Sequence, residues 1–307
     1  MAVNTQLISA TKKLKQAKIK NPHFEAEILL SFVLKKTREH ILTYPNKKLS
    51  QKQIANFNSL VTRRCKGEPI AYLVSHKEFY GLKFKVNKNV LIPRPETELM
   101  IDEITQLIKK NQQPTIFVDI GTGSGCIIIT LAKLLKNKRY SFLASDISKL
   151  ALQIAKQNTK NHRLDKRIIF KQGNLLEPII EIIDSRLQGN NKKKKTLTQK
   201  SKIIITANLP YGWKDWKNNC SMDTISLKFE PSIALFTEKN GLLLYEKFLK
   251  QIAKYKKTYT ESISCFLEFD PRQTTQFKKL IKKYLPNADI KIKKDLSGHN
   301  RLAIISI

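Results

Sequence analysis

Residues 117–125, Phe-Val-Asp-Ile-Gly-Thr-Gly-Ser-Gly, decide the fold, because a short apolar run leads directly into a glycine-rich turn. The run at 115–120 is rich in β-branched and aromatic residues and predicts a buried strand. A helix is predicted over 125–136, immediately after the glycines. Glycine lets a backbone approach a ligand closely and adopt positive φ angles, and the first turn of a helix carries N–H groups without partners inside the helix. The stretch therefore predicts a strand–turn–helix unit that binds a polar ligand.

Strands and helices alternate along the rest of the chain. Further strands are predicted at 140–145, 168–171, 203–207 and 263–269, helices at 148–160, 242–255 and 273–284, and two short strands at the C-terminus. Such alternation predicts an α/β domain with a parallel sheet that is covered by helices on both faces.

The residues before the glycine turn divide into two parts. Through residue 78, apolar side chains recur at spacings of three and four residues, which predicts helices. Between 79 and 95 the apolar residues alternate around Asn87-Lys88-Asn89, which predicts a β-hairpin, and Pro95 suits the first turn of a following helix. We therefore expect a helical domain at 1–78 that recognises the substrate, a hairpin linker at 79–95, and an α/β domain at 96–307.

Composition excludes some classes and leaves the partner open. No run of eighteen apolar residues and no signal peptide are found, so we expect a cytoplasmic protein without a membrane span. The four cysteines have no metal-ligand spacing, and no metal is expected. The net charge of +32 favours RNA or ribosome contact, or it reflects only the base composition of the genome. Residues 184–202, which contain four consecutive lysines, have no apolar period and predict an insertion loop with either a solvated or a partner-binding role.

The glycine turn favours one kind of ligand. Its spacing is G-x-G-x-G, and Cys126 occupies the position where a dinucleotide-binding motif has its third glycine. Asp119 would repel a pyrophosphate, but it can accept hydrogen bonds from an ammonium group or from water bound to it. Asp146, at the end of the next strand, is placed to accept ribose hydroxyls, or alternatively to cap the helix that begins near Ser148. The pattern favours S-adenosylmethionine over NAD, with Asp119, Gly121, Thr122, Gly123, Ser124, Gly125 and Asp146 as cofactor-binding residues.

A second motif follows the strand predicted at 203–207. Asn208-Leu209-Pro210-Tyr211 would lie at the carboxyl end of that strand, beside the same ligand. The nitrogen of an amide or aryl amine is a poor nucleophile, and it needs two acceptors for its N–H bonds to hold it in line with a methyl group. The Asn208 side-chain oxygen and the Leu209 carbonyl are predicted to be these acceptors, with Asn208 also contacting the cofactor. Pro210 would stiffen the turn, and the Tyr211 ring would pack against a flat acceptor.

Other motifs carry a more specific signal. They are Asn21-Pro22 and residues 25–30, 67–73, 91–98, 230–232, 240–242, 267–268 with Gln273, and 295–301. Through these motifs, above all Ile-Pro-Arg-Pro-Glu-Thr-Glu at 92–98, the chain resembles the HemK/PrmC family of release-factor glutamine N5-methyltransferases over nearly its whole length. The resemblance implies a small helical domain, a Rossmann-like catalytic domain with a seven-stranded sheet, and S-adenosylmethionine as cofactor. It implies that a monomer methylates the glutamine in the Gly-Gly-Gln loop of class I peptide chain release factors and so tunes translation termination.

Two positions depart from the family pattern. Leu209 stands where proline is usual, and Asn-Leu-Pro-Tyr also occurs in adenine dimethyltransferases of ribosomal RNA. The alternative function is therefore N6-methylation of adenine in RNA or other nucleic acid. Asn174 and Leu175 stand where an acidic and an aromatic residue are common, and both are expected to contact the adenine of the cofactor. A non-catalytic binding protein is a third class, which the intact Asp119, Asp146, Asn208 and Tyr211 oppose.

Overall fold

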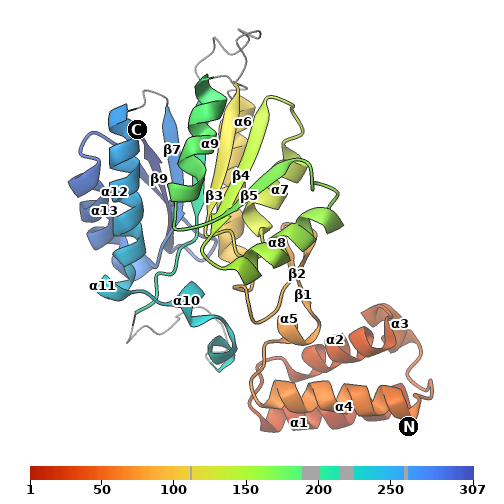
Figure 1. Ribbon diagram of the computed structural model, residues 1–307. Coiled ribbons are helices and arrows are strands. Elements are labelled where there is room, and N and C mark those ends of the chain that lie inside the picture. The colour runs from red at the N-terminus through yellow and green to blue at the C-terminus, as the bar shows by residue number, and fades with distance from the viewer. Residues whose placement is uncertain (111–112, 189–200, 214–224, 259–261) are drawn as a thin grey trace. The chain divides into compact units, whose positions relative to one another are not determined.

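The computed structural model describes residues 1–110, 113–188, 201–213, 225–258 and 262–307 (Figure 1). The chain forms two compact units. The first comprises residues 1–76 and 86–88 with the described part of 217–230, and the second comprises 77–85, 231–307 and the described part of 89–216. Each unit has its own hydrophobic core.

The first unit is helical, as the sequence predicts. Its helices are α1 (Val3–Gln16), α2 (Pro22–Leu34), α3 (Arg38–Thr43), α4 (Gln51–Cys65) and α5 (Ile70–Leu73), with a 3-10 turn at Ser226–Phe229. Leu14, Leu29 and Phe57 are completely buried between α1, α2 and α4, which explains the apolar spacing of three and four residues. Arg64 of α4 forms an ion pair with Glu25 of α2, with a distance of 2.5 Å between Nε and Oε2.

The hairpin is present, but its turn was predicted at the wrong place. Strands β1 (His76–Phe79) and β2 (Leu82–Lys85) are joined at Tyr80-Gly81 rather than at Asn87–Asn89. Tyr80 and Gly81 both have positive φ angles, 51° and 69°, which suit a two-residue hairpin turn. The Tyr80 N–H donates to Glu98 at 2.7 Å, and this hydrogen bond holds the non-glycine residue of the turn.

The second unit contains the predicted seven-stranded sheet. Its strands are β3 (Thr115–Ile120), β4 (Tyr140–Asp146), β5 (Ile168–Gln172), β6 (Lys202–Ala207), β7 (Ile263–Glu268), β8 (Asp289–Lys294) and β9 (Asn300–Ser306). They lie in the order β5-β4-β3-β6-β7-β9-β8. The first five are parallel, and β9 runs antiparallel to both β7 and β8. Every residue of β3 is buried, as expected of a central parallel strand.

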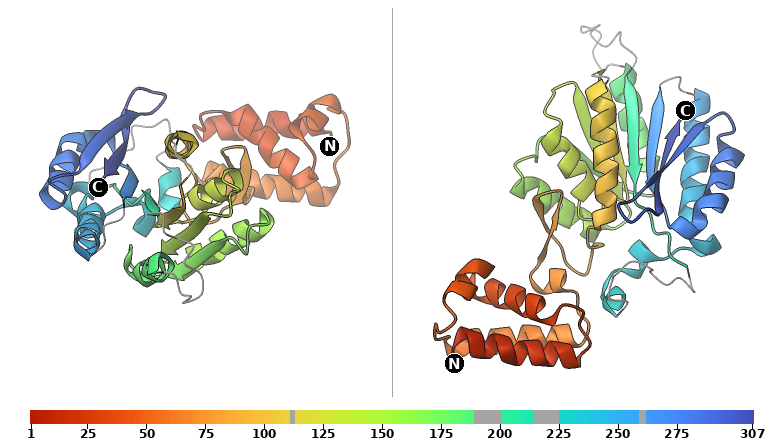
Figure 2. Two further views of the ribbon diagram at one scale, coloured as in Figure 1. Left: turned by 90° about the horizontal axis from the view of Figure 1, so that it is seen from above. Right: turned by 180° about the vertical axis from the view of Figure 1, so that it is seen from behind.

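Helices cover both faces of the sheet (Figure 2). Phe117 of β3 packs with α6 (Glu98–Lys110) and α7 (Cys126–Leu134), whereas Val118 belongs to the core beneath α9 (Glu177–Gln188), α12 (Leu243–Thr258) and α13 (Thr274–Tyr284). This division follows from the alternation of side chains along a strand. The remaining elements are α8 (Lys149–Asn161), α10 (Ser232–Leu235), α11 (Glu238–Gly241) and 3-10 turns at Pro95–Thr97 and Pro271–Gln273.

The insertion predicted at 184–202 is shorter than expected. Helix α9 continues through Gln188, because Leu176, Ile179 and Ile183 form a buried stripe at helical spacing, and β6 already begins at Lys202. Residues 189–200, which include the four lysines, lie outside the described residues. Among the helices that are described, none has the length and apolar character needed to cross a membrane.

The strand order positions a site. Strand β4 lies on one side of β3 and β6 on the other, so the chain reverses its direction of winding at β3. In an open parallel sheet, the crevice outside the carboxyl ends of the strands at such a point is where ligands bind. The glycine turn after β3 and the Asn208 motif after β6 both lie at this edge.

Gly241 provides a test of the packing behind this edge. Its φ is +81°, and a Cβ at this position would overlap the carbonyl oxygen of Tyr211. Gly298 is a matched control, because its φ is +80° and a Cβ there would meet nothing within 4 Å. We expect Gly298→Ala to lower the free energy of unfolding by about 1–2 kcal/mol through backbone strain alone. Gly241→Ala should cost at least about 3 kcal/mol, because overpacking adds to the strain. Urea denaturation measures both, and equal losses would contradict the close approach.

Candidate active site

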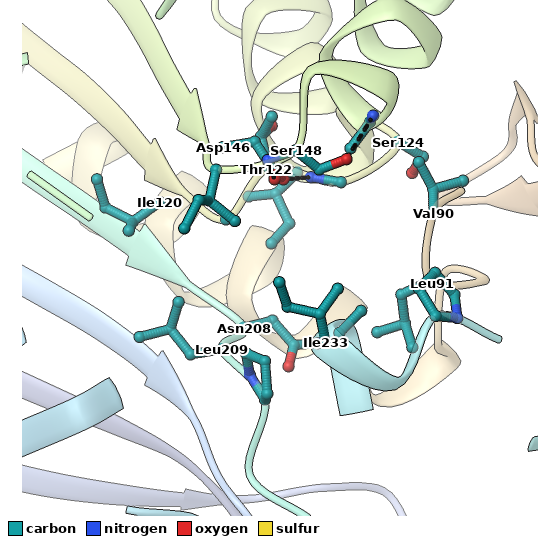
Figure 3. Close-up of a pocket in the computed structure, with 18 of the residues that line it drawn as sticks. Val90, Leu91, Ile120, Thr122, Ser124, Asp146, Ser148, Asn208, Leu209 and Ile233 are labelled. Carbon is teal, nitrogen blue, oxygen red and sulfur yellow. Dashed lines mark hydrogen bonds between the residues drawn. The ribbon is translucent and has the colours of Figure 1, made fainter. Parts of the chain in front are cut away.

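A cavity lies at the carboxyl ends of β3, β4, β5 and β6, within the second unit (Figure 3). Its walls come from segments that are far apart in the sequence. Residues within 89–97, 120–127, 146–151 and 231–234 line it, together with all of 173–175 and 208–210 and with Leu244. Thr122 and Asp146 lie across the cavity from Asn208 and Leu209 in Figure 3. The structure thus brings the two predicted motifs to one cavity.

The glycine turn forms a rigid edge of this cavity. The N–H groups of Gly121 and Thr122 both donate to the Ser145 carbonyl, at 2.9 and 3.0 Å. Gly121 and Gly123 have φ angles of +68° and +56°, which an L side chain rarely adopts. A Cβ added to Gly123 would meet only the Gly121 carbonyl oxygen, at 4.0 Å, so it would occupy cavity space. Ser124 also lines the cavity, and Gly125 is the N-cap of α7.

Asp146 is held by backbone donors on two sides. Its Oδ2 accepts from the Gly123 N–H and its Oδ1 from the Ser148 N–H, each at 2.8 Å. The alternative of Asp146 as the helix cap is wrong, because Ser148 is the N-cap of α8 and accepts from the Ala151 N–H. Burial raises the pKa of Asp146, and these backbone hydrogen bonds oppose the rise. The carboxylate keeps lone pairs for a ligand in the cavity.

Asp119 does not line the cavity, which corrects the expected contact with an ammonium group. Its carboxylate is completely buried and accepts from the Thr122 hydroxyl at 2.6 Å and the Thr206 hydroxyl at 2.8 Å. Burial raises its pKa to about 7, although both hydrogen bonds oppose the rise. Asp119 therefore connects the glycine turn to β6 and affects a ligand only through Thr122.

The loop after β5 supplies the third edge. Gly173, Asn174 and Leu175 line the cavity. The Asn174 amide NH₂ donates to Glu177 Oε1 at 3.3 Å, so the side-chain oxygen of Asn174 takes no part in this hydrogen bond. Leu175 has a positive φ of 52°, and its carbonyl accepts from the buried Ser145 hydroxyl at 2.7 Å. The end of β4 and the loop after β5 are therefore joined directly.

The motif after β6 is only partly in the cavity. Asn208, Leu209 and Pro210 line it. The Asn208 Nδ2 donates to the Thr97 hydroxyl at 3.1 Å, and the Leu209 N–H donates to the Tyr245 hydroxyl at 3.2 Å.

Tyr211 does not line the cavity, which corrects the expectation that its ring packs against the acceptor. Its hydroxyl donates to Glu268 Oε1 at 3.2 Å, and its carbonyl accepts from Gln273 Nε2 at 3.0 Å. Burial raises the pKa of Tyr211, and the nearby Glu268 adds to the rise. Tyr211 thus fixes the turn from behind.

Several residues of the site had no predicted role. Thr97 and Arg94 line the cavity. Behind the Asn208 motif, the Tyr245 hydroxyl accepts from the Leu209 N–H, and Glu268 accepts from the hydroxyls of Thr97 and Tyr211. The sequence did contain a signal, because residues 92–98 and 267–268 are among its most specific motifs. The motif pattern alone does not say which side chains these residues contact.

Comparison with known proteins identifies the family. Residues 6–74 match the PrmC N-terminal domain and residues 109–187 match a methyltransferase domain. A release factor glutamine methyltransferase of Koribacter versatilis is 34% identical, over 84% of this chain and 83% of its own length. One from Bacillus anthracis is 30% identical, over 92% of this chain and 91% of its own. The chain belongs to the release factor glutamine methyltransferase family.

Other similarities are narrower. A bifunctional methyltransferase of Rickettsia typhi is 36% identical over 98% of this chain, but the chain spans only 56% of that relative's length. The crystal structure of the hMettl16 catalytic domain in complex with the MAT2A 3'UTR hairpin 6 has a TM-score of 0.50 and 17% sequence identity to this chain. The match covers 84% of this chain and 81% of the hMettl16 chain. At this identity the similarity shows the fold alone.

The buried Asp119 predicts a pH effect on stability. Its pKa rises from 3.8 to about 7 on folding, so between these pH values the folded protein holds a proton that the unfolded chain releases. The contribution of the protonated Asp119 to the free energy of unfolding is fully present below about pH 4 and is lost as the pH rises through about 7. Asp119→Asn cannot ionise. Its free energy of unfolding, relative to the parent, should rise from pH 4 to pH 7 by up to roughly 4 kcal/mol in urea denaturation. A pH-independent difference would contradict the raised pKa.

Proposed function

We propose that this protein uses S-adenosylmethionine to methylate N5 of the glutamine in the Gly-Gly-Gln loop of class I peptide chain release factors, thereby tuning translation termination. One observation carries the proposal: the glycine turn with Asp146 and the Asn208 motif line the same cavity. Membership of the release factor glutamine methyltransferase family supports the choice of substrate.

The cavity fits the cofactor. Gly121 and Gly123 form a cradle that a Cβ would fill, and Asp146 offers a carboxylate that two backbone N–H groups already orient toward that cradle. Asp146 would accept ribose hydroxyls, and the Asn174 oxygen would accept from the adenine amino group, because its NH₂ is directed to Glu177. When bound, S-adenosylmethionine supplies a methyl group on a positively charged sulfur.

The residues after β6 would hold the acceptor. A glutamine side-chain nitrogen has its lone pair delocalised into the amide and carries two N–H bonds. The Asn208 side-chain oxygen and the Leu209 carbonyl would each accept one of them, while Pro210 restricts the turn. The Asn208 amide is held beforehand by the bond from its Nδ2 to Thr97, and the backbone at Leu209 by the bond from its N–H to Tyr245. The gain in rate would then come from orientation and from dipoles that need little rearrangement.

The roles of the other parts follow from this assignment. We propose that residues 1–78 recognise the release factor, which the match to the PrmC N-terminal domain supports. The net charge of +32 would assist an approach to ribosomal RNA or another acidic surface, and a monomer would suffice, because the cavity is lined within one chain.

Adenine N6-methylation is the second candidate. It is favoured by Leu209, whose motif Asn-Leu-Pro-Tyr is shared with enzymes that act on ribosomal RNA. The fold itself does not separate the two, because an exocyclic amine, like a primary amide, presents two N–H bonds. The family membership favours glutamine.

Cofactor choice is tested by calorimetry. S-adenosylmethionine should bind and NAD should not, because Cys126 occupies the third glycine position of a dinucleotide site and the carboxylate of Asp146 lines the cavity beside the turn. Gly123→Val should abolish binding, since its side chain would occupy the cradle. Gly298→Val, at a similar φ but outside the cavity, should bind as the parent does. Tight NAD binding by the parent would overturn the assignment.

The acceptor site is tested by Asn208→Ala. Removing one fixed acceptor should lower kcat by about 10²–10³ and change KM less, because the contact strengthens as the nitrogen becomes pyramidal. Asn137→Ala, at a half-buried asparagine that lies outside the cavity, is the control. Transfer of labelled methyl groups to a release factor and to ribosomal RNA gives the measurement. Strong labelling of the RNA with none on the release factor would favour adenine instead.

A further inference from the structure

A chain of buried hydrogen bonds lies behind Asn208. The Asn208 Nδ2 donates to Thr97 Oγ1 at 3.1 Å, and Thr97 Oγ1 donates to Glu268 Oε2 at 2.7 Å. The Tyr211 hydroxyl donates to the other carboxylate oxygen of Glu268 at 3.2 Å. Thr97 and Glu268 are each only 2% exposed, so water does not replace these partners. These hydrogen bonds join the motif at 92–98 to the end of β7 and to the residues that follow β6.

Each hydrogen bond in this buried series has a defined donor and acceptor. In the structure both hydroxyls direct their single protons to the carboxyl oxygens of Glu268. Thr97 then has no proton left for Asn208 and can only accept. An amide side chain can rotate by 180° and exchange its oxygen with its NH₂, but only the orientation with NH₂ toward Thr97 makes the hydrogen bond. The reversed orientation would place two oxygens with lone pairs against each other in a buried site, which is costly.

The surroundings of Glu268 act on its charge in opposite ways. Burial raises its pKa, and the charge of Glu96 adds to the rise. The hydroxyls of Thr97 and Tyr211 and the charge of Arg301 favour the ionised form. Arg301 is itself 5% exposed and donates from Nε to Asp295 at 3.1 Å. The carboxylate therefore has donors on both oxygens and a cation nearby, as an ionised buried group requires.

We propose that Thr97 and Glu268 are positioning residues that hold the Asn208 amide with its oxygen toward the cavity. Thr97 contacts Asn208 directly, and Glu268 acts through Thr97. The inference deepens the proposed function and rests on it for the identity of the acceptor. It implies that the Ile-Pro-Arg-Pro-Glu-Thr-Glu motif contributes to methyl transfer through its threonine, and that the fixed oxygen selects acceptors that present an N–H bond.

Nuclear magnetic resonance tests the orientation without any substrate. Protein labelled with ¹⁵N-asparagine should show one Asn208 side-chain NH₂ proton that exchanges slowly with solvent, the signal being assigned by its absence from Asn208→Ala. Thr97→Val should accelerate this exchange, because valine has nearly the shape of threonine but cannot accept a hydrogen bond. Thr97→Ser should restore slow exchange. Two rapidly exchanging protons in the parent would overturn the proposal.

Steady-state kinetics test the consequence. Thr97→Val should lower kcat toward the release factor by about 10- to 100-fold, with a smaller change in KM, because a misoriented amide no longer holds the reacting nitrogen. Thr97→Ser should recover most of that loss. Thr105→Val on the adjoining helix α6 is the matched control, because the Thr105 hydroxyl donates to the Asp102 carbonyl of that helix and does not line the cavity. Its kcat should equal that of the parent.

The two arms separate the possible failures. If the parent methylates no release factor, the proposed function fails, and the exchange of the Asn208 protons still decides the orientation. If the parent is active but Thr97→Val retains its kcat within twofold and leaves the exchange unchanged, the positioning role is excluded. Melting temperatures of all variants identify any variant that loses activity through unfolding. The kinetics of such a variant are then set aside, and the exchange rate of the Asn208 protons in the parent decides the proposal.

Discussion

The hydrogen bonds that Thr122 and Thr206 donate to Asp119 connect the two halves of the site. Thr122 belongs to the glycine turn after β3, and Thr206 lies two residues before Asn208 on β6. Methyl transfer requires donor and acceptor atoms to be held in line within a few tenths of an ångström. Two loops that are each anchored to one buried carboxylate cannot drift apart independently. The separation of the glycine turn from the Asn208 motif is therefore set by a residue that does not line the cavity.

The same arrangement explains how the motif tolerates Leu209. Proline, which the family usually has at this position, lacks a backbone N–H. Here the Leu209 N–H donates to the Tyr245 hydroxyl, which in turn donates to the Glu268 carbonyl. The rigidity that a proline ring would supply is replaced by a hydrogen bond to a fully buried tyrosine. The leucine at this position thus allows a backbone hydrogen bond that a proline could not make, and this bond holds the start of the motif.

Backbone elements could be predicted from the sequence more completely than side-chain directions. Strand β3 is found over the predicted residues, and the glycine turn and the Asn208 motif do share a cavity. These features depend on local pattern and on the rule that parallel strands end at one edge. The directions of Asp119 and Tyr211 depend instead on Thr206 and Glu268, which are 87 and 57 positions away in the chain. No local pattern contains that information. The hairpin turn was misplaced for a similar reason, because Glu98 holds Tyr80 in its unusual conformation.

The positive charge of the chain is not concentrated at the cavity. Among the described residues that line the cavity, Arg94 and Asp146 are the charged ones, and Asp119 and Glu268 lie directly behind the wall. No lysine is among the lining residues, although lysines supply most of the net charge of +32. Carboxylates near the cavity suit a cofactor that carries a positive charge on sulfur. We expect the lysines elsewhere in the chain to act over the longer range at which macromolecules approach one another, where salt screens their charge. In the proposed function, cofactor binding and partner attraction would therefore depend on separate groups of residues, so that a strongly basic chain could still bind a cationic cofactor.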